Sequence, residues 1–176
     1  ETRDYQLWNS MLCRCYDEKL HAYRPTYEKC SVSDNFKYLP YFEEWCHQQI
    51  GFDQVGWQLD KDILIKGNKI YSEDTCCFVP AEINSLFIKC DRSRGEYPIG
   101  VSYHKRVRKY VAKMRKFKEN IHLGYFSKPD EAFNAYKQAK EDYIKEVAEK
   151  WKDQIDPRVY EALMSYEAEM NLGGML

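Results

Sequence analysis

The sequence lacks any apolar run close to the about 18 to 20 residues that a helix needs to cross a bilayer, which excludes a membrane-spanning class. Its first four residues do not begin a basic segment followed by an apolar one, so we expect a cytoplasmic protein without a secretory signal. Apolar residues make up 44% and charged residues 31% of the 176 positions, which excludes collagen, coiled-coil and disordered chains. This length suits one ordinary domain or two small ones.

The cysteine pattern gives little support to zinc. The seven cysteines are an odd number, and without a secretory signal we expect them to be reduced. Structural zinc sites usually use cysteine pairs about two to four residues apart. This chain offers only the closer pairs Cys13/Cys15 and Cys76/Cys77. We therefore expect buried free thiols, which behave as small hydrophobic groups, with a metal–thiolate site as the alternative. The other cysteines are Cys30, Cys46 and Cys90.

Charge is segregated along the chain, although the formal net charge is only -1. Residues 1–98 carry 12 Lys/Arg and 16 Asp/Glu, a net charge of -4, and residues 128–176 carry 7 and 11, again -4. Residues 99–127 carry 8 Lys/Arg and one acid, Glu119, a net charge of +7. A basic stripe between acidic flanks favours binding to a polyanion over a merely solvated charged surface.

Apolar residues spaced by three and four predict two helices in the first part of the chain. The first covers 5–16 with Asp4 as its cap, and the second covers 39–49 with a proline in its first turn. Residues 17–38 are rich in tyrosine and are expected to be irregular. The remaining elements expected in this part are strands over 57–64 and 76–79 and a short helix over 80–88.

A polar linker over 91–98 is expected to separate a first module, 1–90, from a second, 99–176. In the second module an amphipathic helix begins after Ser127, and a last short helix begins at Asp156. The expected strands cover 99–103, 109–115 and 120–126. The predicted class is α+β, with a helical first module that contains a small ββα hairpin, and a three-stranded antiparallel sheet backed by a helix.

Alternation in the middle strand predicts a covered face and an open face. Tyr110, Ala112 and Met114 would pack on the helix. The open face would carry Ser102, His104, Arg106, Val111, Lys113, Arg115 and His122. A twisted antiparallel sheet is narrow enough to enter the major groove of double-stranded DNA, where Arg and Lys reach phosphates and base edges. Basic residues in or beside the turns suit phosphate contacts: Lys105, Arg108, Lys109, Lys116 and Lys118.

Four segments of the second module resemble the ethylene-response-factor-type (AP-two-like) DNA-binding domain. They are Gly100-Val101-Ser102-Tyr103, Lys109-Tyr110-Val111-Ala112-Lys113-Met114, His122-Leu123-Gly124-Tyr125-Phe126 and Pro129-Asp130-Glu131-Ala132-Phe133, the last continued by Ala135-Tyr136. The resemblance implies three strands backed by one helix, with the outer sheet face in the major groove. Two positions differ: Tyr110 stands where the family has Trp, and Ser102 where an Arg often follows Gly-Val.

The first module resembles the phage and prophage HNH-type endonucleases, which often carry an AP-two-like DNA reader. The matching segments are 8–16, Phe42 with Trp45, 59–63 with Gly67-Asn68, and 71–80. The resemblance implies metal-assisted phosphodiester hydrolysis by a ββα hairpin that holds one divalent ion. For a phage-encoded protein, the location would be the host cytoplasm.

The implied catalytic set departs from that family. Lys61 stands at the position of the family's His, and Thr75 at the position of its later Asn. Lysine, with an ordinary pKa near 10.4, is a poor general base at pH 7. Asp60 and Asp62 alternate along the expected strand, so they would face one side and bind Mg²⁺ or another divalent ion. Asn68 would hold the turn or complete the site. The alternative for Asp60, Asp62 and Asn68 is a polar scaffold around a turn, and the alternatives for Lys61 are a surface lysine or a clamp for a phosphate.

Three functions remain open at this stage. The first is an HNH-type endonuclease that uses Asp60, Lys61, Asp62 and Asn68, with His47 as the spare candidate for a base. The second is a DNA-binding protein whose degenerate module is a scaffold. The third is a phage-borne inhibitor whose acidic module mimics DNA and binds a host protein. Double-stranded DNA is the expected partner, a membrane is not, and a homodimer is left open.

Overall fold

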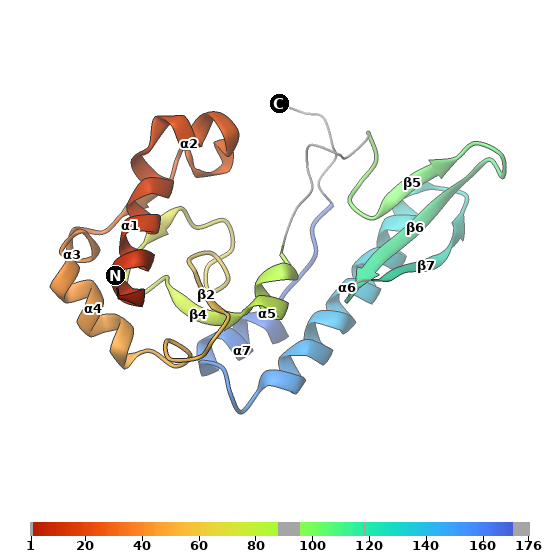
Figure 1. Cartoon of the computed structure of the whole chain (residues 1–176). Coiled ribbons are helices and arrows are strands. Elements are labelled where there is room, and N and C mark those ends of the chain that lie inside the picture. The colour runs from red at the N-terminus through yellow and green to blue at the C-terminus, as the bar shows by residue number, and fades with distance from the viewer. Residues whose placement is uncertain (1, 88–95, 118, 171–176) are drawn as a thin grey trace. The chain divides into compact units, whose positions relative to one another are not determined.

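A computed structural model describes residues 2–87, 96–117 and 119–170 (Figure 1). The described residues form two compact units and confirm the α+β class. Unit 1 contains those of 1–84 and 151–162, and unit 2 contains those of 85–150 and 163–176. Residues 88–95, which hold Cys90 and most of the expected linker, lie outside the described residues. No helix in the described ranges is both long and apolar enough to cross a membrane.

Short helices and two small strand pairs make up unit 1. Strand β1 pairs with β3 in parallel, and β2 pairs with β4 in the antiparallel sense. Two elements, α5 and α7, extend by one or two residues beyond the unit. The elements are α1 (Arg3–Tyr16), α2 (Glu18–Tyr23), the 3-10 helix η1 (Pro25–Tyr27), β1 (Ser31–Val32), α3 (Asp34–Lys37), α4 (Leu39–Gln48), β2 (Trp57–Asp60), β3 (Ile70–Tyr71), β4 (Cys77–Pro80), α5 (Ala81–Ser85) and α7 (Pro157–Met164).

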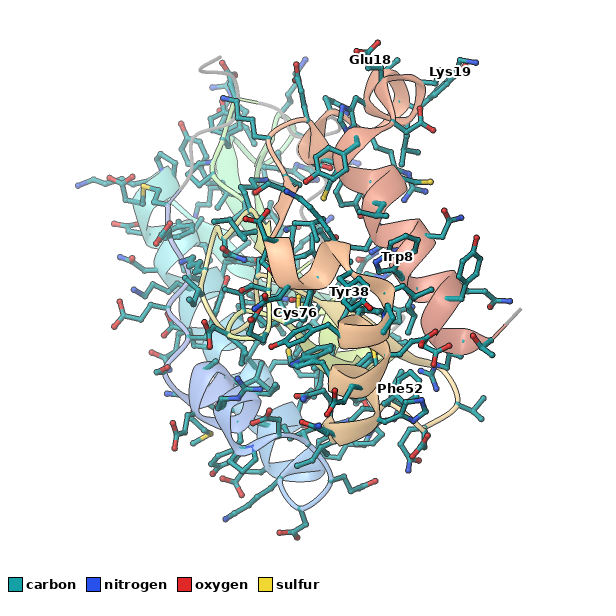
Figure 2. The ribbon with its side chains drawn as sticks, turned by 90° about the vertical axis from the view of Figure 1, so that its left-hand side faces the viewer. Trp8, Glu18, Lys19, Tyr38, Phe52 and Cys76 are labelled. Carbon is teal, nitrogen blue, oxygen red and sulfur yellow. The ribbon has the colours of Figure 1, made fainter. Side chains whose placement is uncertain are left out.

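Helix α1 is fixed to the rest of unit 1 by Trp8. In Figure 2 this side chain lies between α1 and the segment that forms α3 and α4. Its indole Nε1 donates a hydrogen bond to the backbone oxygen of Phe36 at 2.9 Å, so the partly buried ring keeps a polar partner. Glu18 and Lys19, at the start of α2, instead point away into solvent (Figure 2).

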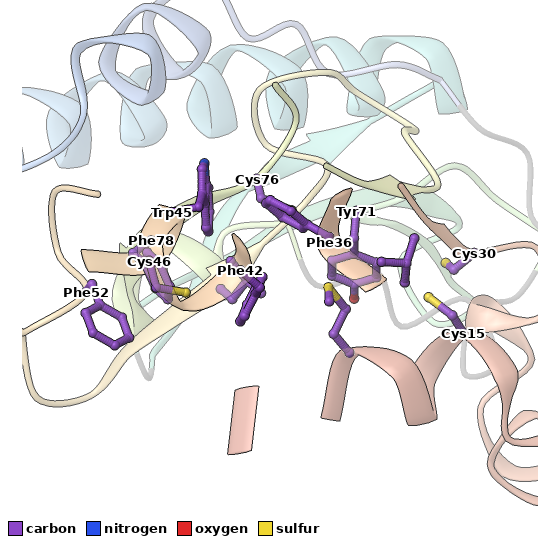
Figure 3. Packing of buried hydrophobic residues seen from close by; sticks show 13 residues of the cluster. Cys15, Cys30, Phe36, Phe42, Trp45, Cys46, Phe52, Tyr71, Cys76 and Phe78 are labelled. Atoms are coloured by element: carbon purple, nitrogen blue, oxygen red, sulfur yellow. The ribbon is translucent and has the colours of Figure 1, made fainter. Parts of the chain in front are cut away.

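The core of unit 1 is aromatic and contains reduced cysteines (Figure 3). The ring of Phe36 lies 4.7 Å from that of Trp45 and 5.1 Å from that of Phe42, measured between centroids. Phe78 on β4 completes the cluster, 5.9 Å from Trp45. Edge-to-face and offset contacts of this kind stabilise a core beyond the area they bury. Among the described cysteines none forms a disulfide and all but Cys13 are buried, as expected for free thiols.

Several sequence-based boundaries are wrong in unit 1, and side-chain hydrogen bonds explain two of them. The expected irregular stretch 17–38 contains two short helices, because Asp17 accepts from the N–H groups of Lys19 and Leu20, and Ser33 accepts from that of Phe36. Asp4 does not cap α1. It lies inside the first turn and is buried beside His47. The expected helix over 80–88 is described only as α5, which ends at Ser85.

The segment Trp151–Ala162 belongs to unit 1, in contrast to the division expected from sequence. The indole Nε1 of Trp151 donates to Glu82 Oε2 at 2.8 Å, and its ring meets that of Trp57 edge-on at 5.9 Å. The short helix that follows begins where expected, because the Asp156 carboxylate accepts from the backbone N–H of Arg158 at 2.8 Å.

Unit 2 is a three-stranded antiparallel sheet in the order β5-β6-β7, backed by one long helix (Figure 1). The strands are β5 (Val101–His104), β6 (Lys109–Lys116) and β7 (Glu119–Phe126), and the helix is α6 (Pro129–Trp151). All four elements were predicted, within two residues at the ends of the strands. The buried residues of α6 recur at three- and four-residue spacing and include Phe133, Tyr136, Tyr143 and Val147.

Gly100 allows the first strand to approach α6 closely. Its φ of +78° lies in the left-handed region, and a Cβ there would stand 2.1 Å from the Cδ2 atom of Tyr136. Neither the backbone conformation nor the space suits a larger residue. Gly67, in unit 1, has the same φ but nothing within 4 Å of the site of its Cβ.

Gly100→Ala is expected to lower the free energy of unfolding by about 2 to 4 kcal/mol, because left-handed strain and overpacking act together. Gly67→Ala is the matched control and should lose only about 1 to 2 kcal/mol, since it adds strain alone. Thermal unfolding followed by circular dichroism measures both variants. Equal losses would show that the contact with Tyr136 does not restrict the strand.

Candidate nucleic-acid interface

Strand register divides the side chains of the sheet between two faces. On β6, Ala112 and Met114 are buried on the α6 side, and Lys116 on the same side pairs with Glu146 of α6 at 2.5 Å. The alternate residues therefore point away from the helix. With their cross-strand partners they form what we call the outer face: Ser102 and His104 on β5; Lys109, Val111, Lys113 and Arg115 on β6; and Asn120, His122 and Tyr125 on β7.

The outer face is exposed, basic and without a carboxylate among the described residues. Every outer-face side chain except that of Val111 is exposed. Lys113 lies opposite His122, and Arg115 lies opposite Asn120. Glu119, the acid nearest in sequence, lies opposite Lys116 in the strand register and therefore on the helix side. Ser102, His104, Lys113, Arg115 and His122 thus occupy the face predicted for them.

Three further basic residues, Lys105, Arg106 and Arg108, lie in the turn between β5 and β6, although Arg106 was expected on the open face. Lys105 and Arg106 are exposed there, and the backbone N–H of Arg108 closes the turn on the carbonyl of His104 at 2.8 Å. Arg108 itself has φ +56° and an exposed side chain. The turn therefore extends the positive surface beyond the end of the outer face.

Lys116 does not occupy the position expected of a phosphate contact. Besides its ion pair with Glu146, its ammonium group lies 5.2 Å from the centre of the Tyr143 ring on α6. This lysine ties the sheet to the helix. Lys118, the other basic residue expected near this turn, lies outside the described residues.

Two outer-face residues, Asn120 and Tyr125, were not predicted from the sequence, and the position of Tyr125 has a local structural cause. Simple alternation from His122 would place position 124 outward and Tyr125 toward α6. The register shifts between Ala112 and Lys113, where Leu123 of β7 has no partner, and the next residues change face. Gly124, with φ +141°, follows the extra residue. A glycine inside an otherwise regular strand was the available signal for this bulge.

In unit 1, the residues expected to be catalytic lie together in the loop that follows β2. The strand ends at Asp60 rather than at position 64, because Asp60 Oδ1 accepts from the N–H groups of both Asp62 and Ile63 at 2.8 Å. Asn68 donates from its amide to the carbonyl oxygens of Lys61 and Ile70 and accepts from the N–H of Ile70. These groups hold the loop in shape.

Lys61 is buried, at 7% exposed, whereas an exposed lysine was one expectation. Its Nζ lies 3.3 Å from Asp62 Oδ2 and 3.2 Å from the Asn68 carbonyl oxygen. The ammonium group is therefore satisfied within the loop, as a buried cation must be. It does not point to solvent, where it could position a phosphate.

Asp60 and Asp62 are close enough to influence one another, but Asp60 Oδ1 accepts from two backbone N–H groups of the loop and Asp62 Oδ2 lies beside the Lys61 ammonium group. Within the described residues no group of three or more His, Cys, Asp and Glu side chains is arranged to hold a metal ion. The donor set does not fit a divalent ion as it stands, and we derive no metal-dependent step from it. The Mg²⁺ site stays a prediction.

His47 pairs with a buried carboxylate, as a spare general base would require. Its Nε2 lies 3.3 Å from Asp4 Oδ2, and the imidazole packs edge-on to Phe52 at 4.8 Å. A hydrogen bond to the side chain of Thr2 is the main reason that the pKa of Asp4 is lowered, although burial opposes it, and His47 adds to the effect. The pair is far in sequence from the 60–68 loop, and no described contact joins the two.

Comparison of the chain with protein-family models, with curated proteins and with solved structures gave no match. Support for a function therefore comes from the outer face of the sheet and from the loop that follows β2.

Burial, followed by the charge of Asp62, raises the pKa of Asp60 from 3.8 to about 6. Between pH 3.8 and about 6 the folded protein binds more protons at Asp60 than the unfolded chain does. The contribution of Asp60 to the free energy of unfolding is therefore highest near pH 4 and falls as the pH rises through 6. Asp60→Asn keeps the acceptor for both N–H groups and should flatten this part of the profile, with a gain of up to about 3 kcal/mol at pH 7.

Urea unfolding at pH 4, 5, 6 and 7 measures the effect, with the exposed Asp53→Asn as control. Loss of stability in Asp60→Asn at pH 7, together with stabilisation of the unmodified protein by Mg²⁺, would contradict the structural role and support the metal site.

Proposed function

We propose that the protein binds double-stranded DNA through the outer face of the β5-β6-β7 sheet. The observation that carries the proposal is the separation of charge in the folded sheet: Lys109, Lys113 and Arg115 all project from β6 on the face that α6 leaves open. Phosphates repel carboxylates, and the described residues of this face include none.

The shape of the face supports the same partner. A twisted antiparallel sheet is narrow enough to enter the major groove, and α6 covers only the opposite face. Lys113 and Arg115 stand two residues apart on one strand, so both project toward a single partner surface. Arginine can contact a guanine edge with two hydrogen bonds, and the exposed turn residues suit phosphates.

Lys113→Ala combined with Arg115→Ala is expected to weaken binding to duplex DNA by about ten-fold or more, because two charged contacts are lost. Fluorescence anisotropy with a labelled duplex at fixed salt measures the change. A control that removes two exposed lysines elsewhere, Lys19→Ala with Lys145→Ala, makes the same change in net charge and should leave affinity nearly unchanged.

The salt dependence of the same variants tests the mechanism. Each phosphate contact contributes about -0.9 to the slope of log affinity against log salt, so the Lys113/Arg115 variant should have a slope shallower by roughly 2. An unchanged slope and affinity would remove the outer face from the proposal. DNA affinity that does not change with salt would count against the outer face and favour the alternative in which the acidic first module binds a protein.

The proposal covers binding and not cleavage, because the loop itself uses the Asp60, Lys61 and Asn68 side chains. We expect supercoiled plasmid to remain intact when incubated with the protein and Mg²⁺ or Mn²⁺, as followed by gel electrophoresis. Nicking that disappears in both Asp60→Ala and Asp62→Ala, and persists in Asp53→Ala, would contradict this expectation and establish the endonuclease.

A further inference from the structure

The outer face also carries a cluster of aromatic rings beside its lysine and arginine side chains. Tyr125 on β7 lies between two imidazoles, with its ring centre 4.8 Å from that of His122 and 5.9 Å from that of His104. Tyr125 is 46% exposed, and both histidines are exposed. We call these three residues the His-Tyr-His cluster. It brings together β5 and β7, the two outer strands, across the middle of the face.

The position of the cluster follows from the sheet register. Tyr125 lies opposite Val111, whose side chain is only 2% exposed although it is on the face away from α6. Ser102 flanks Val111 on the other side. Val111 thus forms an apolar floor on the outer face, and the exposed rings stand around it. The arrangement buries one aliphatic residue and leaves the larger aromatic surface open.

The two imidazoles restrict the tyrosine ring. They meet it at interplanar angles of 53° and 77°, which are tilted and edge-to-face contacts rather than a parallel stack. A ring already restricted by two neighbouring rings loses less side-chain entropy when a ligand packs against it. Among the described residues no hydrogen bond holds the Tyr125 hydroxyl, so neither the hydroxyl nor the exposed part of the ring is committed to the fold.

Cations lie on either side of this ring. Lys109 is the cross-strand partner of His104, and Lys113 is the cross-strand partner of His122. A flat aromatic surface between phosphate-binding cations is the combination by which proteins hold a nucleic-acid strand whose bases are accessible. Paired bases inside a duplex present only their edges, whereas an unpaired base presents a face to a protruding ring.

We propose that the His-Tyr-His cluster is a stacking site for an unpaired nucleobase, so that the outer face prefers DNA containing unpaired bases over fully paired DNA. This inference rests on the proposed function, because Lys109, Lys113 and Arg115 provide the contacts to the phosphates. It adds the substrate class: a locally opened duplex, in which Tyr125 contacts a base.

The experiment compares three fluorescent DNA ligands of equal length and charge: a duplex, the same duplex with a central unpaired bubble, and that bubble with abasic sites in place of its bases. Anisotropy titrations should show tighter binding to the bubble than to the duplex by about 5- to 100-fold, the range for stacking of one base. The abasic bubble should bind like the duplex, because it keeps the opened backbone but has no base to stack.

Substitutions of Tyr125 distinguish stacking by an aromatic ring from simple filling of space by a large side chain. Tyr125→Phe should keep the preference for the bubble, and Tyr125→Leu should abolish it while leaving duplex affinity nearly unchanged. Tyr103→Leu is the matched control, because Tyr103 is 40% exposed but lies on the α6 side, against the Tyr110 ring. Thermal unfolding of each variant confirms that the sheet remains folded, and Tyr125→Phe keeps the test valid if the leucine variant does not fold.

The titrations distinguish failure of the stacking site from failure of the proposed function. Equal affinity of the unmodified protein for duplex and bubble overturns the stacking site but leaves the proposed function standing. Loss of affinity for both ligands in Tyr125→Leu also overturns it, since that result indicates contact with a paired base or a sheet that depends on Tyr125. No binding to any of the three ligands, or no effect of the Lys113/Arg115 variant on them, defeats the proposed function itself.

Discussion

Burial of the apolar side of α6 against the inner face of the β5-β6-β7 sheet is the interaction on which the outer face depends. A three-stranded sheet without a packed face is marginal in water. The buried rings of Phe133, Tyr136 and Tyr143 provide that packing from the helix, and Ala112 and Met114 provide it from the middle strand. Because side chains alternate along β6, fixing one set inward fixes Lys113 and Arg115 outward.

Unit 1 shows how a segment rich in charge can be used for structure. The loop after β2 contains two carboxylates, an amide and a buried lysine, and side chains of this kind also build catalytic sites. Here Asp60 Oδ1 accepts from two backbone N–H groups and the Asn68 amide donates to two carbonyl oxygens, so both side chains serve the loop. Lys61 completes the loop from inside. Burial and the nearby charge of Asp62 disfavour the ionised form of Asp60 at this position, and the raised pKa of Asp60 reflects this cost.

The sequence predicted unit 2 well because its signals are local and periodic. Alternation along β6 placed Lys113 and Arg115 correctly, and the three- and four-residue spacing in α6 placed its buried side. Unit 1 was harder, because its elements are short and depend on individual contacts. The helix after Asp17 depends on a side-chain cap, and Trp151 joins unit 1 through contacts with residues more than sixty positions away. Neither has a period that a sequence pattern can reveal.

The unpaired Leu123 has a consequence for the hairpin as a whole. A β-strand has only two sides, so one additional residue reverses the side on which every later residue lies. Strict alternation from His122 through Leu123 would turn Phe126 outward and Tyr125 inward, whereas the bulge keeps Tyr125 opposite Val111 and Phe126 opposite Tyr110. The bulge at this point therefore decides which side chains of the last part of β7 meet the solvent. Among proteins built on this sheet, a gap of one residue here would accompany a regular strand that keeps the same two faces.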